Sequence, residues 1–558
     1  MEEQQNKLTR FWHELKRRKV VAVIIVYATT AFILMQLADL LEESLHLPDW
    51  VTSLVTILLI TGFPIAIIFS WIFDVSSKGI TKTEPEPEKE PTKSNKSANE
   101  KSIVVLPFQN MSSDPEQEYF SDGIAEEIIN SLTYISELKV IARTSAFSFK
   151  NQNVDVREIG QKLDVNYLLE GSVRKAGNTL RITAQLINLA DGSHIYSERF
   201  DRKLKDIFEI QDEITLQIVD KLKLKLLNNE KEAIQKRYTD NTEAYNLYLL
   251  GRYHNYLLTK EDGEKAKDCF ESAIKIDASY APAYVGLGIY YLNQGGVFRN
   301  ILSNEIAIPS AKKYFLKALK VDPEYAEAHS NLGSIYSVFE FEFKKADYHI
   351  KRSFEIEPKN SEVLRYYGII SSLQGKLLEA IKYIEEAIKL DPLMLPAYVN
   401  ASSYQFWTGN YEQAINYSEK ALQINPAFAW ANMYLGLSHF QLGSEEKAID
   451  FLQKVTIIPG LAEPYLAYVY ASLGRREEAQ KVLDVLNDLY EKKLVSASGL
   501  AMAYLGLGET QKVFELLEAS LKEKIPYSGH TLTIKLDPFW DSIRGHPEFK
   551  KILSKIWK

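Results

Sequence analysis

The sequence is poor in the residues from which catalytic and metal sites are usually built. It contains one cysteine, Cys269, so no intrachain disulfide can form. The helical context of this cysteine, KAKDCFESAIKI, favours a small packing residue over a reactive thiol. The nine histidines are scattered, and the sequence has no H-E-x-x-H motif, no phosphate-binding P-loop and no G-x-S-x-G elbow. We therefore expect no catalytic residue, no metal site and no cofactor, and a protein that is not an enzyme.

Positive charge is not in excess either. Lys and Arg number 66 and Asp and Glu number 74, which gives a formal net charge of −8. A chain with this balance lacks the basic surface on which general nucleic-acid binding depends, so we expect no nucleic-acid partner. The densest polar patch, SSDPEQEYFSDGIAEE, is acidic. The capping of a helix by Asp122 or Ser121 explains this patch better than a cation site does.

Two long apolar runs lie near the N-terminus. Residues 20–38 and 51–73 hold no charge, and as helices both would be long enough to cross about 30 Å of hydrocarbon. Lysines and arginines precede the first run and lysines follow the second, whereas the loop between them is acidic, which places both flanks in the cytoplasm. We therefore predict a transmembrane helical hairpin over 20–73, with helices at 20–41 and 51–73.

The segment before this hairpin, 1–19, is predicted to be a basic cytoplasmic segment. A cleaved secretory signal is the alternative reading of the first apolar run. That run is longer than the usual apolar core of a signal peptide, and no A-x-A site follows it. After the hairpin, residues 74–100 are rich in Pro, Glu, Lys and Ser, which predicts a disordered linker.

Residues 101–227 alternate between strand-like and helix-like segments. Their order is β-α-β-α-β-β-β-α, and hairpin turn signals occur at 176–178 and 191–193. This order predicts an α+β domain in which helices cover one face of a mixed sheet.

A period of about 34 residues runs through the second half of the chain. The prolines stop each second helix, the glycines end each first helix in a left-handed conformation, and the alanines let the two helices approach closely. Residues 241–525 therefore resemble the tetratricopeptide repeat family, with about eight helical hairpins stacked into an all-α superhelix, and 526–558 is predicted to cap the last unit. The marker residues that keep this period are Pro323, Pro358, Pro392, Pro426, Pro459, Gly375, Gly409, Gly443, Ala380, Ala414 and Ala448.

The α+β domain resembles the TolB-like amino-terminal domain of bacterial proteins. The likeness is carried by the segments VLPFQNMSSDPEQEYFSDGIAEEI, LLEGSVRKAGNTLRITAQLINLADG and IFEIQDEI. In that family the domain commonly precedes tetratricopeptide repeats, sometimes beside a nucleotide cyclase or a DNA-binding winged helix. The resemblance implies a bacterial source and no established ligand.

The first helix of each repeat supplies the candidate binding residues. In the repeat family, positions on this helix face the concave side and hold peptides, and here they become more apolar toward the later units. Such a groove favours an apolar or amphipathic segment, although packing between adjacent units would explain the same residues equally well. The predicted peptide groove consists of Arg365, Ile369, Val399, Ser403, Phe406, Trp430, Met433, Leu437 and Phe440.

Taken together, these features predict a multidomain protein with a two-helix transmembrane hairpin, an α+β domain and a tetratricopeptide superhelix. We expect a non-catalytic adaptor or scaffold, multi-pass in a bacterial inner membrane with its soluble domains in the cytoplasm, that binds a protein or peptide partner in the repeat groove. Self-association is left open. The alternative is a sensory or regulatory component whose α+β domain binds a ligand and controls a separate cyclase or transcription factor.

Overall fold

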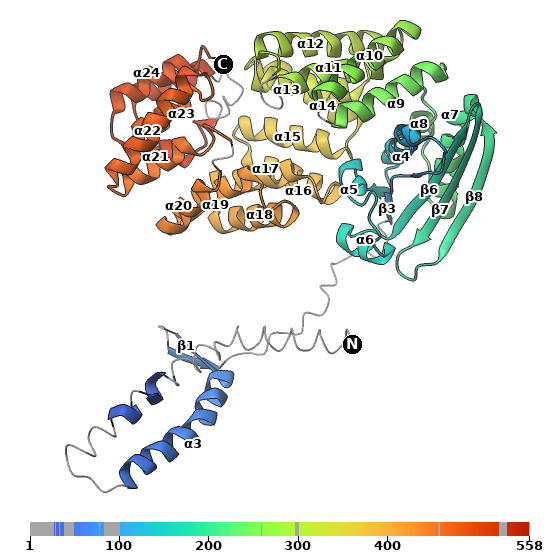
Figure 1. Ribbon diagram of the computed structural model, residues 1–558. Helices are drawn as coiled ribbons and strands as arrows, with labels where there is room; N and C mark the ends of the chain where they lie inside the picture. The colour runs from blue at the N-terminus through green and yellow to red at the C-terminus, as the bar shows by residue number, and fades with distance from the viewer. Residues whose placement is uncertain are drawn as a thin grey trace. The chain divides into compact units, whose positions relative to one another are not determined.

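The chain divides into two compact units, Met1–Ala98 and Asn99–Lys558 (Figure 1). The second unit contains a mixed sheet with its helices, followed by a long array of helical hairpins. The computed structural model describes residues 27, 29–32, 34–37, 50–76, 79–82, 101–257, 259–295, 301–455, 458–523 and 533–556.

The first unit contains one long described helix and a small hairpin. Helix α3 (Trp50–Ile72) leads directly into β1 (Phe73–Ser76), which pairs antiparallel with β2 (Gly79–Lys82). The hydroxyl of Tyr27 donates a hydrogen bond to the carbonyl oxygen of Leu59 at 2.8 Å, so the chain before α3 contacts this helix. The hairpin occupies the first part of the predicted linker.

The predicted transmembrane hairpin is wrong. Among the described residues no helix, α3 included, is both long and apolar enough to cross a membrane. A span needs about 20 consecutive, predominantly apolar residues in one helix. The second predicted span, 51–73, coincides with α3, which contains Pro64. Most of the first, 20–41, lies outside the described residues. This finding contradicts the two spans and the multi-pass inner-membrane location predicted from them.

The second unit begins with a mixed six-stranded sheet of order β5-β3-β6-β7-β8, with β4 paired to β6. Strand β3 is parallel to β5 and β6, whereas β6, β7 and β8 are antiparallel neighbours joined by the predicted turns at 176–178 and 191–193. The strands are β3 (Lys101–Val105), β4 (Gln109–Asn110), β5 (Leu138–Val140), β6 (Tyr167–Ala176), β7 (Thr179–Asn188) and β8 (His194–Lys203).

The helices of this domain follow the predicted order, with the short strand β4 and the short helix α5 added. Helix α4 packs against the strands on one side and against the first repeat helix on the other (Figure 1). Burial of apolar side chains from α4 and α7 against the strands forms one core. The helices are α4 (Glu118–Thr133), α5 (Arg143–Phe147), α6 (Val156–Leu163), α7 (Ile207–Lys221) and α8 (Asn228–Ile234).

Sixteen described helices then form eight consecutive hairpins, which we call units one to eight (Figure 1). They confirm the predicted tetratricopeptide superhelix. The helices are, in pairs, α9 (Thr242–Leu257) and α10 (Lys260–Ile276), α11 (Ala281–Gln294) and α12 (Asn304–Val321), α13 (Ala326–Val338) and α14 (Phe343–Ile356), α15 (Ser361–Leu373) and α16 (Leu377–Leu390), α17 (Leu395–Trp407) and α18 (Tyr411–Ile424), α19 (Ala429–Gln441) and α20 (Glu445–Gln453), α21 (Glu463–Ser472) and α22 (Arg476–Glu491), and α23 (Ala497–Gly506) and α24 (Thr510–Ser520).

The periodic residues act as the sequence predicts. Gly409 ends the first helix of unit five with φ +81°, and Gly375 and Gly443 have the same left-handed conformation in the neighbouring units. Ala414 is fully buried at the contact between the two helices of its hairpin. Short local signals of this kind fix each hairpin, and the stacking of the hairpins then buries their apolar faces.

Two elements follow the last unit. The 3-10 helix η3 spans Pro538–Ile543, and α26 spans Pro547–Ile556. Helix α26 lies against α24 and buries Phe549, Ile552 and Ile556.

The left-handed glycines predict a specific stability effect. A methyl group on Gly409 would meet no atom within 4 Å, so the substitution Gly409→Ala is penalised through backbone conformation alone. We expect it to lower the free energy of unfolding by about 1 kcal/mol, measured by urea denaturation followed by circular dichroism. The control is Gly545→Ala, where a methyl group also meets open space and φ is not in the left-handed region. Equal stability of the two variants would contradict this account.

Candidate functional site

The predicted groove residues lie on the first helices of units four, five and six. Seven of the nine are apolar and belong to or pack against one hydrophobic cluster: Ile369, Val399, Phe406, Trp430, Met433, Leu437 and Phe440. Phe406, Met433 and Leu437 are buried, whereas Trp430 and Phe440 are partly exposed. The structure therefore brings these seven residues together along one side of the array.

The two polar members of the predicted groove have local partners. Arg365 forms an ion pair with Glu362 on its own helix at 2.8 Å, and its guanidinium lies 4.4 Å from the centre of the Tyr366 ring. The hydroxyl of Ser403 donates to the carbonyl oxygen of Asn400 at 2.8 Å. Both contacts stabilise the helix that carries them.

A segment near the C-terminus packs against the apolar residues of the predicted groove. The ring of Phe539 in η3 stacks on Phe406 and Phe440, with centroid separations of 6.2 and 5.7 Å. Tyr465 and Tyr468 of α21 meet the same ring edge-on, at 5.1 and 5.0 Å. Phe539 is only 2% exposed. An aromatic residue from the chain's end therefore fills the space between three consecutive first helices, α17, α19 and α21.

Asp537 fixes the approach of this aromatic residue. Its Oδ2 accepts a hydrogen bond from the hydroxyl of Tyr465 at 2.8 Å, and its Oδ1 accepts from the backbone N–H of Phe539 at 3.0 Å. Arg544 donates to the backbone carbonyl of Asp537 at 2.9 Å. Burial raises the pKa of Asp537 to about 6, and the hydrogen bonds from Phe539 and Tyr465 oppose this rise.

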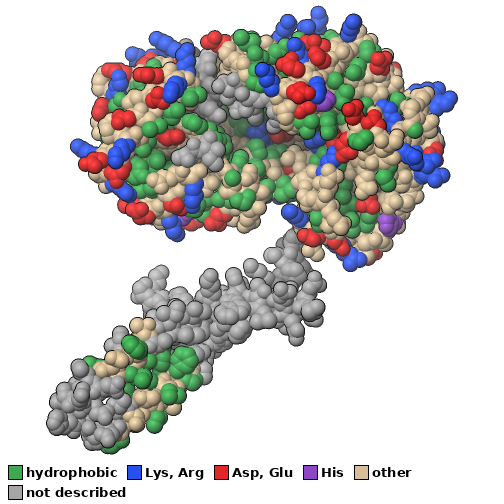
Figure 2. Space-filling view, viewed as in Figure 1, with side chains coloured by type: hydrophobic (Ala, Val, Ile, Leu, Met, Phe, Trp, Pro, Cys, Tyr) green, Lys and Arg blue, Asp and Glu red, His purple; other side chains and the backbone are tan. Residues whose placement is uncertain are grey.

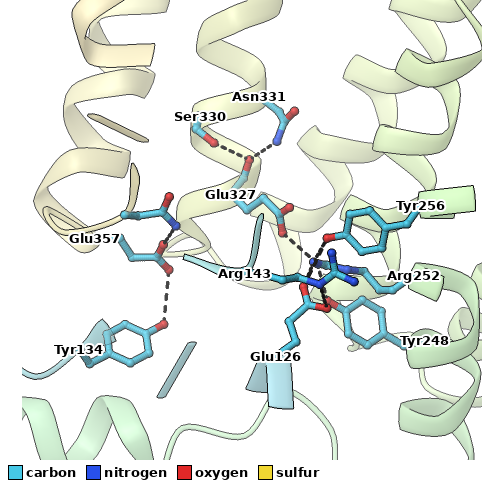
Figure 3. Close-up of polar contacts among 11 residues, drawn as sticks. Glu126, Tyr134, Arg143, Tyr248, Arg252, Tyr256, Glu327, Ser330, Asn331 and Glu357 are labelled. Atoms are coloured by element: carbon cyan, nitrogen blue, oxygen red, sulfur yellow. Dashed lines mark hydrogen bonds and ion pairs between the residues drawn. The ribbon is translucent and has the colours of Figure 1, made fainter. Parts of the chain in front are cut away.

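A second polar cluster joins the α+β domain to the repeats (Figure 3). Glu126 of α4 accepts a hydrogen bond from Arg252 of α9 and another, at 3.1 Å, from Nε of Arg143 in α5. Arg252 also lies 3.8 Å from a carboxylate oxygen of Glu327 in α13, and it donates to the hydroxyl of Tyr256 at 2.7 Å. One arginine of the repeats therefore bridges units one and three to the domain.

The acidic residues around this arginine lie in a poorly solvated environment. Burial and, to a smaller extent, the neighbouring Glu126 carboxylate together raise the pKa of Glu127 to about 7. Burial also raises the pKa of Glu327, although the Arg252 guanidinium opposes this effect. Charges in such a place are stable only when they are paired, which makes Arg252 the central member of the cluster.

The domain also contacts the array at two other points. The hydroxyl of Tyr134 donates to the Glu357 carboxylate, just before α15, at 3.4 Å (Figure 3). The backbone N–H of Ala142 donates to the carbonyl oxygen of Leu390, at the end of α16, at 2.9 Å. The α+β domain is thus attached to the repeats from unit one to the end of unit four.

Other candidate residues have structural roles. Helix α4 begins at Glu118, so Asp122 lies inside it and does not cap it; Asp122 instead pairs with Lys150 at 2.6 Å. Ser121 lies within the same helix. Burial raises the pKa of the Cys269 thiol to about 11, which disfavours the reactive thiolate. Across the residues that the structure describes, no three His, Cys, Asp or Glu side chains are grouped as metal ligands.

Comparison with known families divides the second unit in the same way as its structure does. Residues 99–217 match the second domain of HilA/YgeH-like transcriptional regulators, and 367–392 and 406–458 match tetratricopeptide repeats. The predicted TolB-like assignment of the α+β domain is therefore not supported. The repeats belong to a class that binds protein or peptide partners and is not itself catalytic.

Individual relatives cover only parts of the chain. A putative adenylate cyclase 3 of Rhizobium meliloti (strain 1021) is 44% identical over 191 residues, which are 34% of this chain and 32% of that protein. The chain thus spans about a third of the length of this relative.

Among solved structures, PilF of Pseudomonas aeruginosa has 22% identity and a TM-score of 0.33, covering 42% of this chain and 97% of that one. The type IV pilus biogenesis factor PilW has 18% identity and a TM-score of 0.33, covering 44% and 99%. These likenesses concern the helical-repeat fold and are too low to support a functional argument.

The cluster at Glu126 predicts a stability effect. The substitution Arg252→Met leaves the Glu126 and Glu327 carboxylates without their shared cation, so we expect a loss of about 3 kcal/mol in unfolding free energy. Urea denaturation measures this loss, and faster hydrogen exchange in α4 and α9 would locate it at the interface. The control is Lys492→Met, which removes an exposed pair with Asp488 and is expected to change little.

A second substitution tests whether the unpaired charge causes this loss. Adding Glu327→Gln to Arg252→Met should restore part of the stability, because Glu126 keeps its hydrogen bond from Arg143 whereas the Glu327 carboxylate loses the cation it faces. If Arg252→Met proves as stable as Lys492→Met, the ion pair does not hold the domain to the repeats.

The environment of Asp537 predicts a pH dependence. Because its pKa in the folded protein, about 6, lies above the ordinary value of 3.8, its contact with the groove is favoured while the carboxyl is protonated. This contribution is complete below the ordinary pKa and is lost as the pH rises through 6. We therefore expect the hydrogen-exchange protection of 533–543, corrected for intrinsic rates, to fall between about pH 4 and pH 6.5 and to change little above that range.

The substitution Asp537→Asn should remove this pH dependence, whereas Asp541→Asn, at an exposed residue paired with Arg544, should keep it. The same fall in both variants would show that another group titrates.

Burial raises the pKa of each tyrosine near Asp537, so these side chains stay neutral in this range. The titratable and charged groups that face Asp537 are Tyr411, Tyr434, Tyr465, Tyr468, Asp541 and Arg544.

Proposed function

We propose that this protein is a non-catalytic regulatory adaptor. Its repeats bind a partner protein through the apolar groove, and the attached α+β domain sets the shape of the array that the partner meets. The observation that carries this proposal is the attachment of one domain to the array from unit one to unit four, through Arg252, Tyr134 and Ala142. A displacement of the domain would change the packing of these units against one another.

The binding surface of the adaptor is the groove on the first helices. Trp430 and Phe440 are partly exposed there, beside the buried Phe406 and Leu437. Figure 2 shows a hollow in the middle of the second unit, with hydrophobic side chains along its border. A surface of this composition favours an apolar or amphipathic segment of a partner protein, held by a few aromatic anchors.

The comparisons favour a regulatory role over a purely structural one. The α+β domain is similar to a domain of transcriptional regulators, and the 44% identical relative is a putative adenylate cyclase. A second candidate function follows from this similarity: the α+β domain binds a ligand and controls a separate cyclase or transcription factor. In both cases the chain acts through contact.

Capture of the partner tests the groove. In cell lysates, crosslinking of the wild-type chain identifies bound proteins, and the substitutions Trp430→Ala and Phe440→Ala remove partly exposed aromatic rings. We expect these two changes to lower the recovery of the partner by at least about tenfold, as the loss of an interface anchor does.

The matched control is Leu378→Ala, because this leucine is 81% exposed on α16, a second helix outside the groove. Recovery of the partner should be unchanged in this variant. Equal recovery with the groove variants and with the control would place the binding surface elsewhere. If Arg252→Met, which lies outside the groove, also changes the recovery, the α+β domain regulates binding.

A further inference from the structure

The C-terminal segment does more than cap the array. An array of this kind needs a terminal element that covers the apolar face of its last unit. Helix α26 does this, since Phe549, Ile552 and Ile556 are buried where it lies on α24 of unit eight. Helix η3 has a different position, because Phe539 contacts the first helices of units five, six and seven. Capping does not require a contact with these earlier units.

The geometry at Phe539 is that of a bound ligand. Its ring is nearly parallel to the rings of Phe406 and Phe440, at 23° and 16°, and Tyr465 and Tyr468 close the pocket from the edge at 69° and 80°. Aromatic rings prefer offset-stacked and edge-on arrangements such as these. The groove thus offers a four-sided aromatic site that one ring fills.

The residues before this ring form a local motif that another chain can also supply. Asp537 accepts the backbone N–H of Phe539, and Pro538 opens η3, so the turn is fixed within three residues. The second carboxylate oxygen of Asp537 remains for the hydroxyl of Tyr465. Recognition therefore uses one aromatic ring and one carboxylate in a fixed relation, as in short peptide motifs.

We infer that the groove formed by α17, α19 and α21 recognises an Asp-Pro-aromatic motif, that residues 537–539 occupy it as an internal ligand, and that a partner protein binds by presenting the same motif in their place. This inference rests on the proposed function, because the groove is the same. It adds the chemistry of the partner segment and a step of exchange.

Two physical effects set the balance of this exchange. The internal segment is covalently attached, which gives it a high effective concentration at the groove. The buried carboxylate of Asp537 acts in the opposite direction, because it loses its hydration in the occupied state. The motif of a partner protein can therefore bind only the small fraction of molecules in which residues 537–539 have left the groove. The apparent affinity for the partner is reduced in proportion to that fraction.

A labelled peptide tests the inference on the full chain. The probe is a fluorescent peptide with the sequence of residues 533–545, TIKLDPFWDSIRG, and its binding is followed by fluorescence anisotropy. The substitution Phe539→Ala weakens the internal ligand, so we expect the peptide to bind this variant at least about tenfold more tightly than the wild type. A peptide in which the phenylalanine is replaced by alanine should not bind.

The control is Ile556→Ala, which removes a buried apolar side chain near the end of α26, far along the chain from residues 537–539. It should bind the peptide as weakly as the wild type does. A second variant, Asp537→Ala, keeps the ring and loses the hydrogen bond to Tyr465, and it should give an intermediate affinity even if Phe539→Ala fails to fold. Circular dichroism checks the fold of each variant.

The inference would be overturned if the wild type, Phe539→Ala and Asp537→Ala bound the peptide with equal affinity. Equal binding of the original peptide and of the peptide with alanine in place of phenylalanine would overturn it as well. That result is distinguishable from a failure of the proposed function, in which partner recovery does not depend on Trp430 and Phe440. A partner that requires these residues but lacks an acidic-aromatic motif would preserve the adaptor and overturn the internal-ligand proposal.

Discussion

The arrangement of the second unit depends on the pairing of Arg252 with Glu126 and Glu327. A guanidinium and carboxylates withdrawn from water are stable only together, so separation of the α+β domain from the repeats would leave charges unpaired at both surfaces. The three side chains come from α9, α4 and α13, which are far apart in sequence. Their pairing therefore fixes the domain against two repeat units at once, and the hydrogen bond from Ala142 to Leu390 extends this attachment to a third point.

Much of the array could be predicted from the sequence because its determinants are local. Gly409 needs a left-handed conformation and Ala414 needs a close helix contact, and both requirements recur every 34 residues. The apolar face of the groove follows from the same period. The filling of the groove by Phe539 could not be predicted, because this residue lies more than 130 positions after Phe406 and outside the period. Only the dipeptide Phe539-Trp540 after a proline gives a signal, and it is a weak one.

The errors of prediction have physical explanations of the same kind. The apolar runs near the N-terminus have the composition of membrane spans, but composition does not show whether one continuous helix of sufficient length and apolarity forms. In the α+β domain the order of strands and helices along the chain follows from local patterns. In the sequence, however, Glu126 and Arg143 cannot be distinguished from ordinary polar helix residues. Their role emerges only when α9 is placed beside α4, which is a tertiary contact that no local pattern specifies.

Helix α17 lies between two of the contacts that the array makes with other parts of its chain. Just before this helix, the backbone N–H of Leu393 donates to the hydroxyl of Ser145 in the α+β domain at 2.9 Å. At its other end, Phe406 stacks on Phe539. A helix of 13 residues is a rigid body about 20 Å long. Because a tilt imposed at one end must displace the other, movement of the α+β domain would alter the aromatic site directly, and occupancy of that site would in turn alter the domain contact.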